Sequence, residues 1–249
     1  MAEIEDGRKF EKIALDFLKQ NNLPEAESNF IQALTHMKQS GDEEGQAYVL
    51  GNLGNLCFQS RRLDKAEEYY GKALTYMEKV NDIRGIESSL GNLGSVLFYK
   101  GNLNEAEKTY KKALKFLEDA NDTEGQSIYN ENLGNVYLKK EELAKAEDYF
   151  NRAKTLLDSE KNKDRIKAVE DKLDALQKHP KYVEGKEGNL LNEIESLKKG
   201  GKKREALAKY QELEELYYQG GSIAKAADTI SKSIEIFEEL GDKKSAGIC

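Results

Sequence analysis

Residues 51–58 read GNLGNLCF, and the pattern returns forty residues later as GNLGSVLF at 91–98 and again as ENLGNVYL at 131–138. The segment that follows also recurs, as LDKAEEYYGKAL at 63–74, LNEAEKTYKKAL at 103–114 and LAKAEDYFNRAK at 143–154. No insertion or deletion interrupts this 40-residue period. A fixed period of about 20–50 residues is typical of stacked supersecondary units, so it predicts a repeat architecture.

The register extends over the whole chain. Steps of forty residues from Phe30 reach Tyr70, Tyr110, Phe150, Leu190 and Ile230. We therefore expect a single solenoid over residues 1–249, with repeats at 3–42, 43–82, 83–122, 123–162, 163–202 and 203–242 and the start of a truncated seventh helix at 243–249. The fifth repeat is degenerate, because Lys186 stands where the other copies have alanine.

The apolar spacing within each repeat is helical. Leu50, Leu53 and Cys57 follow one another at intervals of three and four residues, and the second half of the repeat shows the same spacing. Each run ends near a polar breaker, so each repeat is predicted to form two antiparallel helices joined by a short turn. Pro180 falls in the predicted turn of the fifth repeat.

The repeat resembles the tetratricopeptide repeat. The residues that carry the resemblance are Leu53-Gly54, Leu93-Gly94, Leu133-Gly134, Ala66, Ala106, Ala146, Tyr70, Tyr110 and Phe150. The 40-residue unit and its Gly41-Asp42 type of turn are similar to the subtype of kinesin light chains and spindle-orientation adaptors. The resemblance implies an all-α, right-handed superhelical solenoid of six hairpins, or about 12 antiparallel helices, that acts as a protein-protein interaction scaffold or adaptor.

Three glycines interrupt predicted helices at Gly54, Gly94 and Gly134. Because glycine inside a helix costs about 1 kcal/mol relative to alanine, we expect each one to allow close contact between the two helices of its hairpin. Charged pairs on the second helices are expected on exposed faces, where they contribute little to stability. Glu107 is predicted to be such an exposed residue.

Composition excludes several classes of function. A formal net charge of −7 argues against a general nucleic-acid binder. Residues 161–205 alone are basic, with 13 Lys or Arg against 9 Asp or Glu, and are interpreted either as a solvated helical face or as a patch for an acidic partner. No stretch is apolar enough for membrane insertion. Cys57 in a core register and Cys249 at the end give no disulfide framework, which favours a reducing, cytoplasmic setting.

No catalytic residue, cofactor or metal is predicted. His36 and His179 lie in different repeats, and neither has a cysteine or a second histidine at metal-binding spacing. Residues 200–203, GGKK, lack the leading glycine and the Ser or Thr of a phosphate-binding loop, so they are interpreted as a turn. We therefore expect that the protein is not an enzyme.

The first helix of each repeat carries two stripes of residues, of which the one marked by Leu50, Leu53 and Cys57 is expected to pack inward. The resemblance places the second stripe along a concave groove, and function is expected there. The predicted peptide-binding residues, all in repeats two to four, are Tyr48, Gly51, Asn52, Asn55, Phe58, Gly91, Asn92, Ser95, Phe98, Tyr99, Asn132, Asn135 and Lys139. Asparagine both donates and accepts hydrogen bonds, so these side chains can bond the backbone of an extended peptide whatever its sequence.

Two interpretations of this stripe remain open. Gly51 and Gly91 either let a ligand come close or admit the neighbouring repeat, and the asparagines either bind a ligand or are simply solvated. The first functional hypothesis is a module that binds a protein or peptide partner, either as an extended segment or as a helix. The alternatives are a regulatory protein that responds to a signal peptide or ligand, and a scaffold that self-assembles.

The sixth repeat is expected to expose an apolar patch. Ile230, Ile234 and Phe237 lie on one side of its second helix, and nothing that follows in the sequence completes another repeat. Contiguous exposed apolar patches mark association sites. The sequence therefore predicts that this end is covered, either by a second copy of the chain, which would be self-association through the C-terminal repeat, or by residues beyond Cys249.

Overall fold

The computed structural model describes residues 2–157 and 160–240, and these residues form twelve α-helices and no strand. They fall into two compact units, Met1–Lys161 and Asn162–Cys249. The all-α prediction is confirmed within the described residues. The expected start of a seventh helix at 243–249 lies outside them, and a single solenoid of six repeats stays a prediction.

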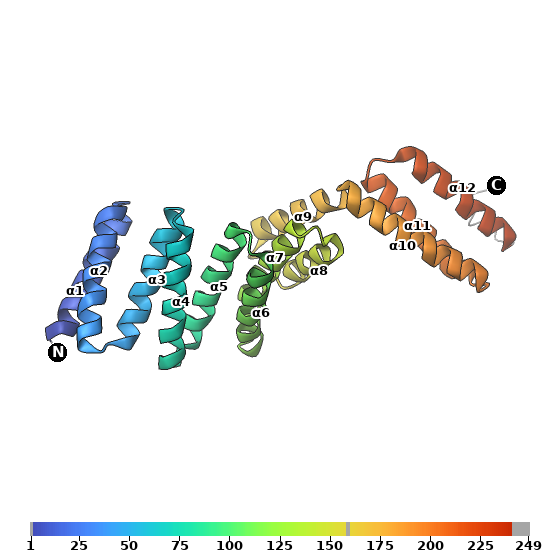
Figure 1. Ribbon diagram of the computed structural model, residues 1–249. Coiled ribbons are helices and arrows are strands. Elements are labelled where there is room, and N and C mark those ends of the chain that lie inside the picture. Colours follow the sequence, from blue (N-terminus) through green and yellow to red (C-terminus); the bar gives the residue numbers. More distant parts are fainter. Residues whose placement is uncertain (1, 158–159, 241–249) are drawn as a thin grey trace. The chain divides into compact units, whose positions relative to one another are not determined.

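The helices correspond to the predicted halves of each repeat (Figure 1). Unit 1 holds α1 (Ala2–Lys19), α2 (Leu23–Ser40), α3 (Glu43–Gln59), α4 (Leu63–Val80), α5 (Ile83–Lys100), α6 (Leu103–Asp119), α7 (Thr123–Lys139) and α8 (Leu143–Thr155). Unit 2 holds α9 (Lys163–Gln177), α10 (Pro180–Lys199), α11 (Lys203–Gln219) and α12 (Ile223–Glu239). In unit 1, consecutive helices pack as four hairpins, one for each of the first four repeats.

A residue in the left-handed conformation reverses the chain inside every hairpin of unit 1. Its φ is 56° at Asn21, 60° at Arg61, 85° at Gly101 and 59° at Glu141. This conformation lets the backbone turn sharply after a helix, and it is uncommon for residues other than glycine. The left-handed residue of the turn therefore recurs every forty residues, although the residue type at that position varies.

Aspartate caps the helix that opens each of repeats two to four. The carboxylates of Asp42, Asp82 and Asp122 accept hydrogen bonds from the backbone amides of Gly45, Gly85 and Gly125, at 2.9, 3.1 and 2.9 Å. A capping carboxylate satisfies an amide that has no partner inside the helix. These caps account for the aspartate in the Gly-Asp and Asn-Asp turns of the sequence.

The glycines of the Leu-Gly pairs contact the aromatic ring of the partner helix, as predicted. A Cβ atom at residue 54 would lie 2.6 Å from Tyr70 Cδ1, one at residue 94 would lie 2.6 Å from Tyr110 Cε1, and one at residue 134 would lie 2.5 Å from Phe150 Cε1. These distances are far shorter than carbon contacts in packed interiors, which are about 3.5–4.0 Å. Only glycine fits at these positions while the three buried rings keep their place.

The fifth repeat departs from the hairpin pattern. In Figure 1, α9 and α10 run nearly end to end, and α10 packs instead against α11. Only Lys178 and His179 separate the two helices, and their φ values of −84° and −70° are not left-handed.

Pro180 explains this departure. It is the first residue of α10, and His179 before it is extended, with ψ of 126°. A proline ring clashes with the residue before it when that residue is helical, so it favours an extended conformation there. The prediction that Pro180 lies in a reversing turn is therefore wrong, because the chain has no left-handed residue at this point with which to fold back.

Carboxylates on the second helices link successive repeats. Glu107 of α6 accepts a hydrogen bond from the Tyr137 hydroxyl at 2.6 Å and pairs with Lys140 at 2.8 Å, both in the next repeat. Eighty residues further on, Glu187 of α10 accepts from Tyr217 at 2.9 Å. The contact between α10 and α11 in unit 2 thus uses the same pair of side chains as the contact between α6 and α7.

The prediction of an exposed Glu107 is wrong, because its side chain is only 20% exposed. Burial acts to raise the pKa of Glu107, but hydrogen bonds from Lys111, Lys140 and Tyr137 outweigh it and lower the pKa to about 2. Charges on this face therefore do more than solvate the surface. They join one repeat to the next.

The sequence predicted the wrong residues for the exposed apolar patch of the sixth repeat. Ile230, Ile234 and Phe237 are half-buried. The exposed large apolar side chains of α12 and its C-terminal end are Ile223 at 71% and Leu240 at 38%, which lie at opposite ends of the helix. Self-association through this repeat stays a prediction, without the contiguous patch that motivated it.

Candidate peptide-binding groove

A pocket of about 250 Å³ lies between the first helices of repeats two and three. Five of the predicted groove residues line it, namely Tyr48, Gly51, Asn52, Asn55 and Asn92. Tyr70 and Met77 of α4 add apolar surface, and Asp82, Arg84 and Ser88 add polar and charged groups. The structure therefore brings together residues from α3 and α5 that the sequence predicted on one stripe.

The asparagines of this pocket do not all have the same role. Asn55 Oδ1 accepts hydrogen bonds from the Tyr70 hydroxyl at 2.7 Å and from Asn92 Nδ2 at 3.4 Å. Within residues 2–157 and 160–240, the half-buried Asn52 side chain makes no hydrogen bond. Asn55 thus holds the wall of the pocket in place, whereas the Asn52 amide is left to bind a ligand or water.

Tyr48 and Ser95 also have partners inside the protein. The Tyr48 hydroxyl donates to Asp82 Oδ2 at 2.9 Å, and this hydrogen bond raises the pKa of Tyr48. Ser95 Oγ accepts from the Tyr110 hydroxyl at 3.0 Å and donates to the Gly91 carbonyl at 3.0 Å. Ser95 therefore plays the part in repeat three that Asn55 plays in repeat two.

The two groove glycines differ. A Cβ atom at Gly51 would meet no atom within 4 Å, so the space beside it is open. One at Gly91 would overlap the hydroxyl of Tyr129 and lie 2.9 Å from its Cζ atom. Gly91 thus admits the neighbouring repeat, which is one of the two interpretations left open by the sequence, and Gly51 does not.

Four further predicted residues form a second cluster, where α3, α5 and α7 end. The Phe58 and Tyr99 rings have centroids 5.5 Å apart, and the Phe98 and Tyr99 rings 5.7 Å apart. Lys139 Nζ lies 4.9 Å from the centre of the Phe98 ring, within the range of a cation–π contact. Tyr99 is 53% exposed, so this cluster offers aromatic surface beside a positive charge.

The predicted residues of repeat four lie apart from the pocket. Asn132 and Asn135 are half-buried on α7, and neither side chain makes a hydrogen bond within the described part of the chain. The predicted groove asparagines are thus present as amide groups on the three first helices α3, α5 and α7. The structure brings only those of repeats two and three into one pocket.

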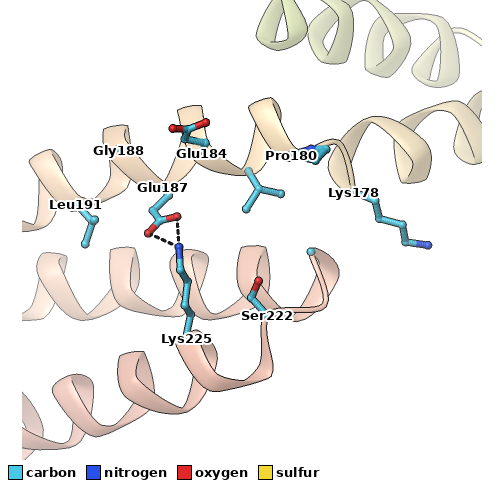
Figure 2. Close-up of a pocket in the computed structure, with 10 residues that line it drawn as sticks. Lys178, Pro180, Glu184, Glu187, Gly188, Leu191, Ser222 and Lys225 are labelled. Atoms are coloured by element: carbon cyan, nitrogen blue, oxygen red, sulfur yellow. Dashed lines mark hydrogen bonds and ion pairs between the residues drawn. The ribbon is translucent and has the colours of Figure 1, made fainter.

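Unit 2 contains a larger pocket that the sequence did not predict, of about 610 Å³. Figure 2 shows Glu187 of α10 pointing toward Lys225 of α12 across it, where the two charges pair at 2.8 Å. The hydrogen bond from Lys225 lowers the pKa of Glu187. Pro180 and Leu191 contribute apolar surface. The signal in the sequence was Pro180, which prevents α9 from folding back along α10.

In the part of the chain that the structure describes, no group of three His, Cys, Asp or Glu side chains could hold a metal ion. None of the helices over residues 2–157 and 160–240 is long and apolar enough to cross a membrane. Cys57 is free and buried, and burial raises the pKa of its thiol.

The tetratricopeptide repeat family model matches residues 7–79 and 85–159, which covers the four hairpins of unit 1. A search of curated proteins finds no match. Among solved structures, the apo form of RapI is similar at 13% identity and a TM-score of 0.65, over 94% of this chain and 98% of that one.

Two other solved structures are similar at the level of the fold. A Rap protein complexed with Competence and Sporulation Factor has 16% identity and a TM-score of 0.55, over 97% of this chain and 72% of that one. A putative kinesin light chain with nearly identical TPR-like repeats from Podosopora anserina has 12% identity and a TM-score of 0.54, over 94% and 95% of the two chains.

Proposed function

The chain belongs to the tetratricopeptide repeat family, and from this premise we propose that it is a non-enzymatic interaction protein that binds an extended peptide or a partner helix along α3, α5 and α7. The observation that carries the proposal is the pocket between repeats two and three. It gathers predicted groove residues from two repeats, and its asparagine amides have hydrogen-bonding capacity that the fold leaves unused.

An extended peptide fits this surface better than a small ligand does. Pockets that enclose drug-sized ligands measure about 300–1,000 Å³, and the groove pocket is smaller, at about 250 Å³. Asn52, Asn92 and Asn132 occupy one register on three successive first helices. Amides at this repeat spacing suit the regular backbone groups of a peptide that follows the groove.

The test is the triple variant Asn52→Ala/Asn92→Ala/Asn132→Ala. The three side chains are half-buried at the groove, and the one hydrogen bond among them within the described residues is the 3.4 Å contact from Asn92 to Asn55, so the melting temperature should change by only a few degrees. Capture of partner proteins from lysate should fall by at least about tenfold, a loss of roughly 1.4 kcal/mol.

The matched control replaces three exposed asparagines on second helices, as Asn104→Ala/Asn151→Ala/Asn192→Ala. It should capture the same proteins as wild type. If both triple variants captured them equally well, the groove would not be the binding surface.

The second candidate is a regulatory protein that changes shape when it binds a signal peptide. Its support is the likeness of fold to a Rap protein complexed with Competence and Sporulation Factor. Small-angle scattering separates the candidates, because an adaptor should keep its radius of gyration when partner peptide is added and a regulator of this kind should not. A self-assembling scaffold, the third alternative, would instead show a mass that rises with concentration.

A further inference from the structure

Equivalent spaces beside Gly51 and Gly91 are filled differently. Over Gly91, between repeats three and four, lies Tyr129 of α7, which is only 7% exposed. Its ring is tilted against that of Tyr110, with centroids 6.0 Å apart. Forty residues earlier, the register of Tyr129 holds Ser89, so no side chain fills the space over Gly51.

The open space over Gly51 retains the surroundings of the filled one. Ser89 and Gly51 both line the groove pocket. So does Tyr70, which holds the register of Tyr110, the ring that Tyr129 contacts one repeat later. The pocket is thus a vacant copy of a site that an aromatic side chain occupies elsewhere in the same protein.

We propose that this pocket binds an aromatic side chain of the partner peptide, which takes the place that Tyr129 fills between repeats three and four. The inference rests on the proposed function and adds to it the anchor residue of the ligand. The ring would lie over Gly51 and against Tyr70, since aromatic rings favour such tilted contacts at centroid separations of about 4.5–7 Å. The peptide backbone would pass beside the Asn52 amide.

The pocket differs from its filled copy at one polar position. The Tyr129 hydroxyl donates a hydrogen bond to the carboxylate of Glu87, and the register of Glu87 in repeat two holds Ala47, which lines the pocket. A phenol would therefore find no carboxylate at that point. We expect phenylalanine to bind at least as tightly as tyrosine, because a buried hydroxyl without a partner is unfavourable.

The test measures binding of the full chain to four sets of short random peptides whose central residue is fixed as Phe, Tyr, Leu or Ala. The Phe-centred set should bind at least about tenfold more tightly than the Ala-centred set, and no more weakly than the Tyr-centred set. In Ser89→Tyr the protein's own ring should fill the pocket, so this preference should vanish while the helical content is retained.

A second variant keeps the proposal testable if Ser89→Tyr does not fold. Gly51→Leu also fills the pocket, from a position where a Cβ atom meets nothing within 4 Å, and Gly71→Leu on α4 is its control because that glycine is equally open and does not line the pocket. The aromatic preference should be lost in Gly51→Leu and kept in Gly71→Leu.

The outcomes separate the two proposals. If the peptide sets bind equally well, and the triple asparagine variant abolishes that binding, the groove stands as the binding site and the aromatic anchor is overturned. A preference for Phe that survives in both Ser89→Tyr and Gly51→Leu overturns the anchor as well, because the ring would then bind elsewhere. If no set binds, groove recognition of peptides fails, and the anchor fails with it.

Discussion

At the scale of single residues, glycine has three different roles in one family of repeats. Gly54 and its equivalents admit a ring of their own hairpin, Gly91 admits a ring of the next repeat, and Gly51 faces open space. The first role was predicted from the sequence, because glycine inside a helix is costly and close contact between the two helices of a hairpin offsets that cost. The difference between Gly51 and Gly91 was not predicted, because both stand in the same sequence context.

A signal for that difference was nevertheless present. The residue that fills the space beside Gly91 is Tyr129, on another helix, and its equivalent in the preceding repeat is Ser89. Each groove glycine can be compared with the residue that faces it from the first helix of the next repeat. That comparison pairs Gly91 with a large side chain and Gly51 with a small one.

This distinction predicts opposite effects of one substitution. Gly51→Ala should raise stability by up to about 1 kcal/mol, because alanine favours the helix and its Cβ meets no atom within 4 Å. Gly91→Ala should lower stability by about 1–3 kcal/mol, because its methyl group overlaps Tyr129. Chemical denaturation of both variants measures the two free energies of unfolding.

A third measurement checks the cause. In a Tyr129→Ser background the obstructing ring is gone, so Gly91→Ala should lose most of its penalty. Equal changes in unfolding free energy for Gly51→Ala and Gly91→Ala, or a penalty that persists without Tyr129, would contradict the assignment of Gly91 to repeat packing.

At the scale of helices, the 40-residue period predicted that the helices exist and in what order they follow one another. The structure added the contacts that hold neighbouring helices together. The twelve helices lie where the registers placed them. The failure at Pro180 came from treating a proline between two helices as evidence of a turn, when its effect is on the residue before it. Glu107 was misjudged because its partners, Lys140 and Tyr137, lie about one repeat away and cannot be found from spacing within one helix.

The Glu107 contacts predict a dependence on pH. Its pKa is lowered from 4.5 to about 2 in the folded protein, so the ionised form stabilises the fold above about pH 4.5 and this contribution is lost as pH falls toward 2. Glu107→Gln should cost about 1–3 kcal/mol at neutral pH. The difference in unfolding free energy between wild type and variant should shrink between pH 4.5 and pH 2.

The control for this measurement is Glu118→Gln, an exposed carboxylate on the same helix, which should stay within about 0.5 kcal/mol of wild type throughout. A difference for Glu107→Gln that stayed constant down to pH 2 would mean that the carboxylate charge is not what joins α6 to α7.

At the scale of the whole molecule, the sequence predicted the family and a candidate binding face, and it could not name the partner. The stripe on the first helices was predictable because helical spacing separates it from the core stripe. The sequence did not predict which of the asparagines on this stripe form hydrogen bonds inside the protein, because that depends on whether the second helix offers a hydroxyl group. In repeat two the Tyr70 hydroxyl donates to Asn55. In repeat four the ring beside Gly134 belongs to Phe150, which has no hydroxyl.

The most direct test of the groove as the binding surface is hydrogen–deuterium exchange of the full chain, with and without a captured partner peptide. Binding should slow exchange in α3, α5 and α7, most strongly around Gly51, Asn52 and Asn92, because these residues line the pocket. The second helices α4, α6 and α8 should change little. Slowed exchange confined to those second helices, or to residues 162–240, would contradict the account.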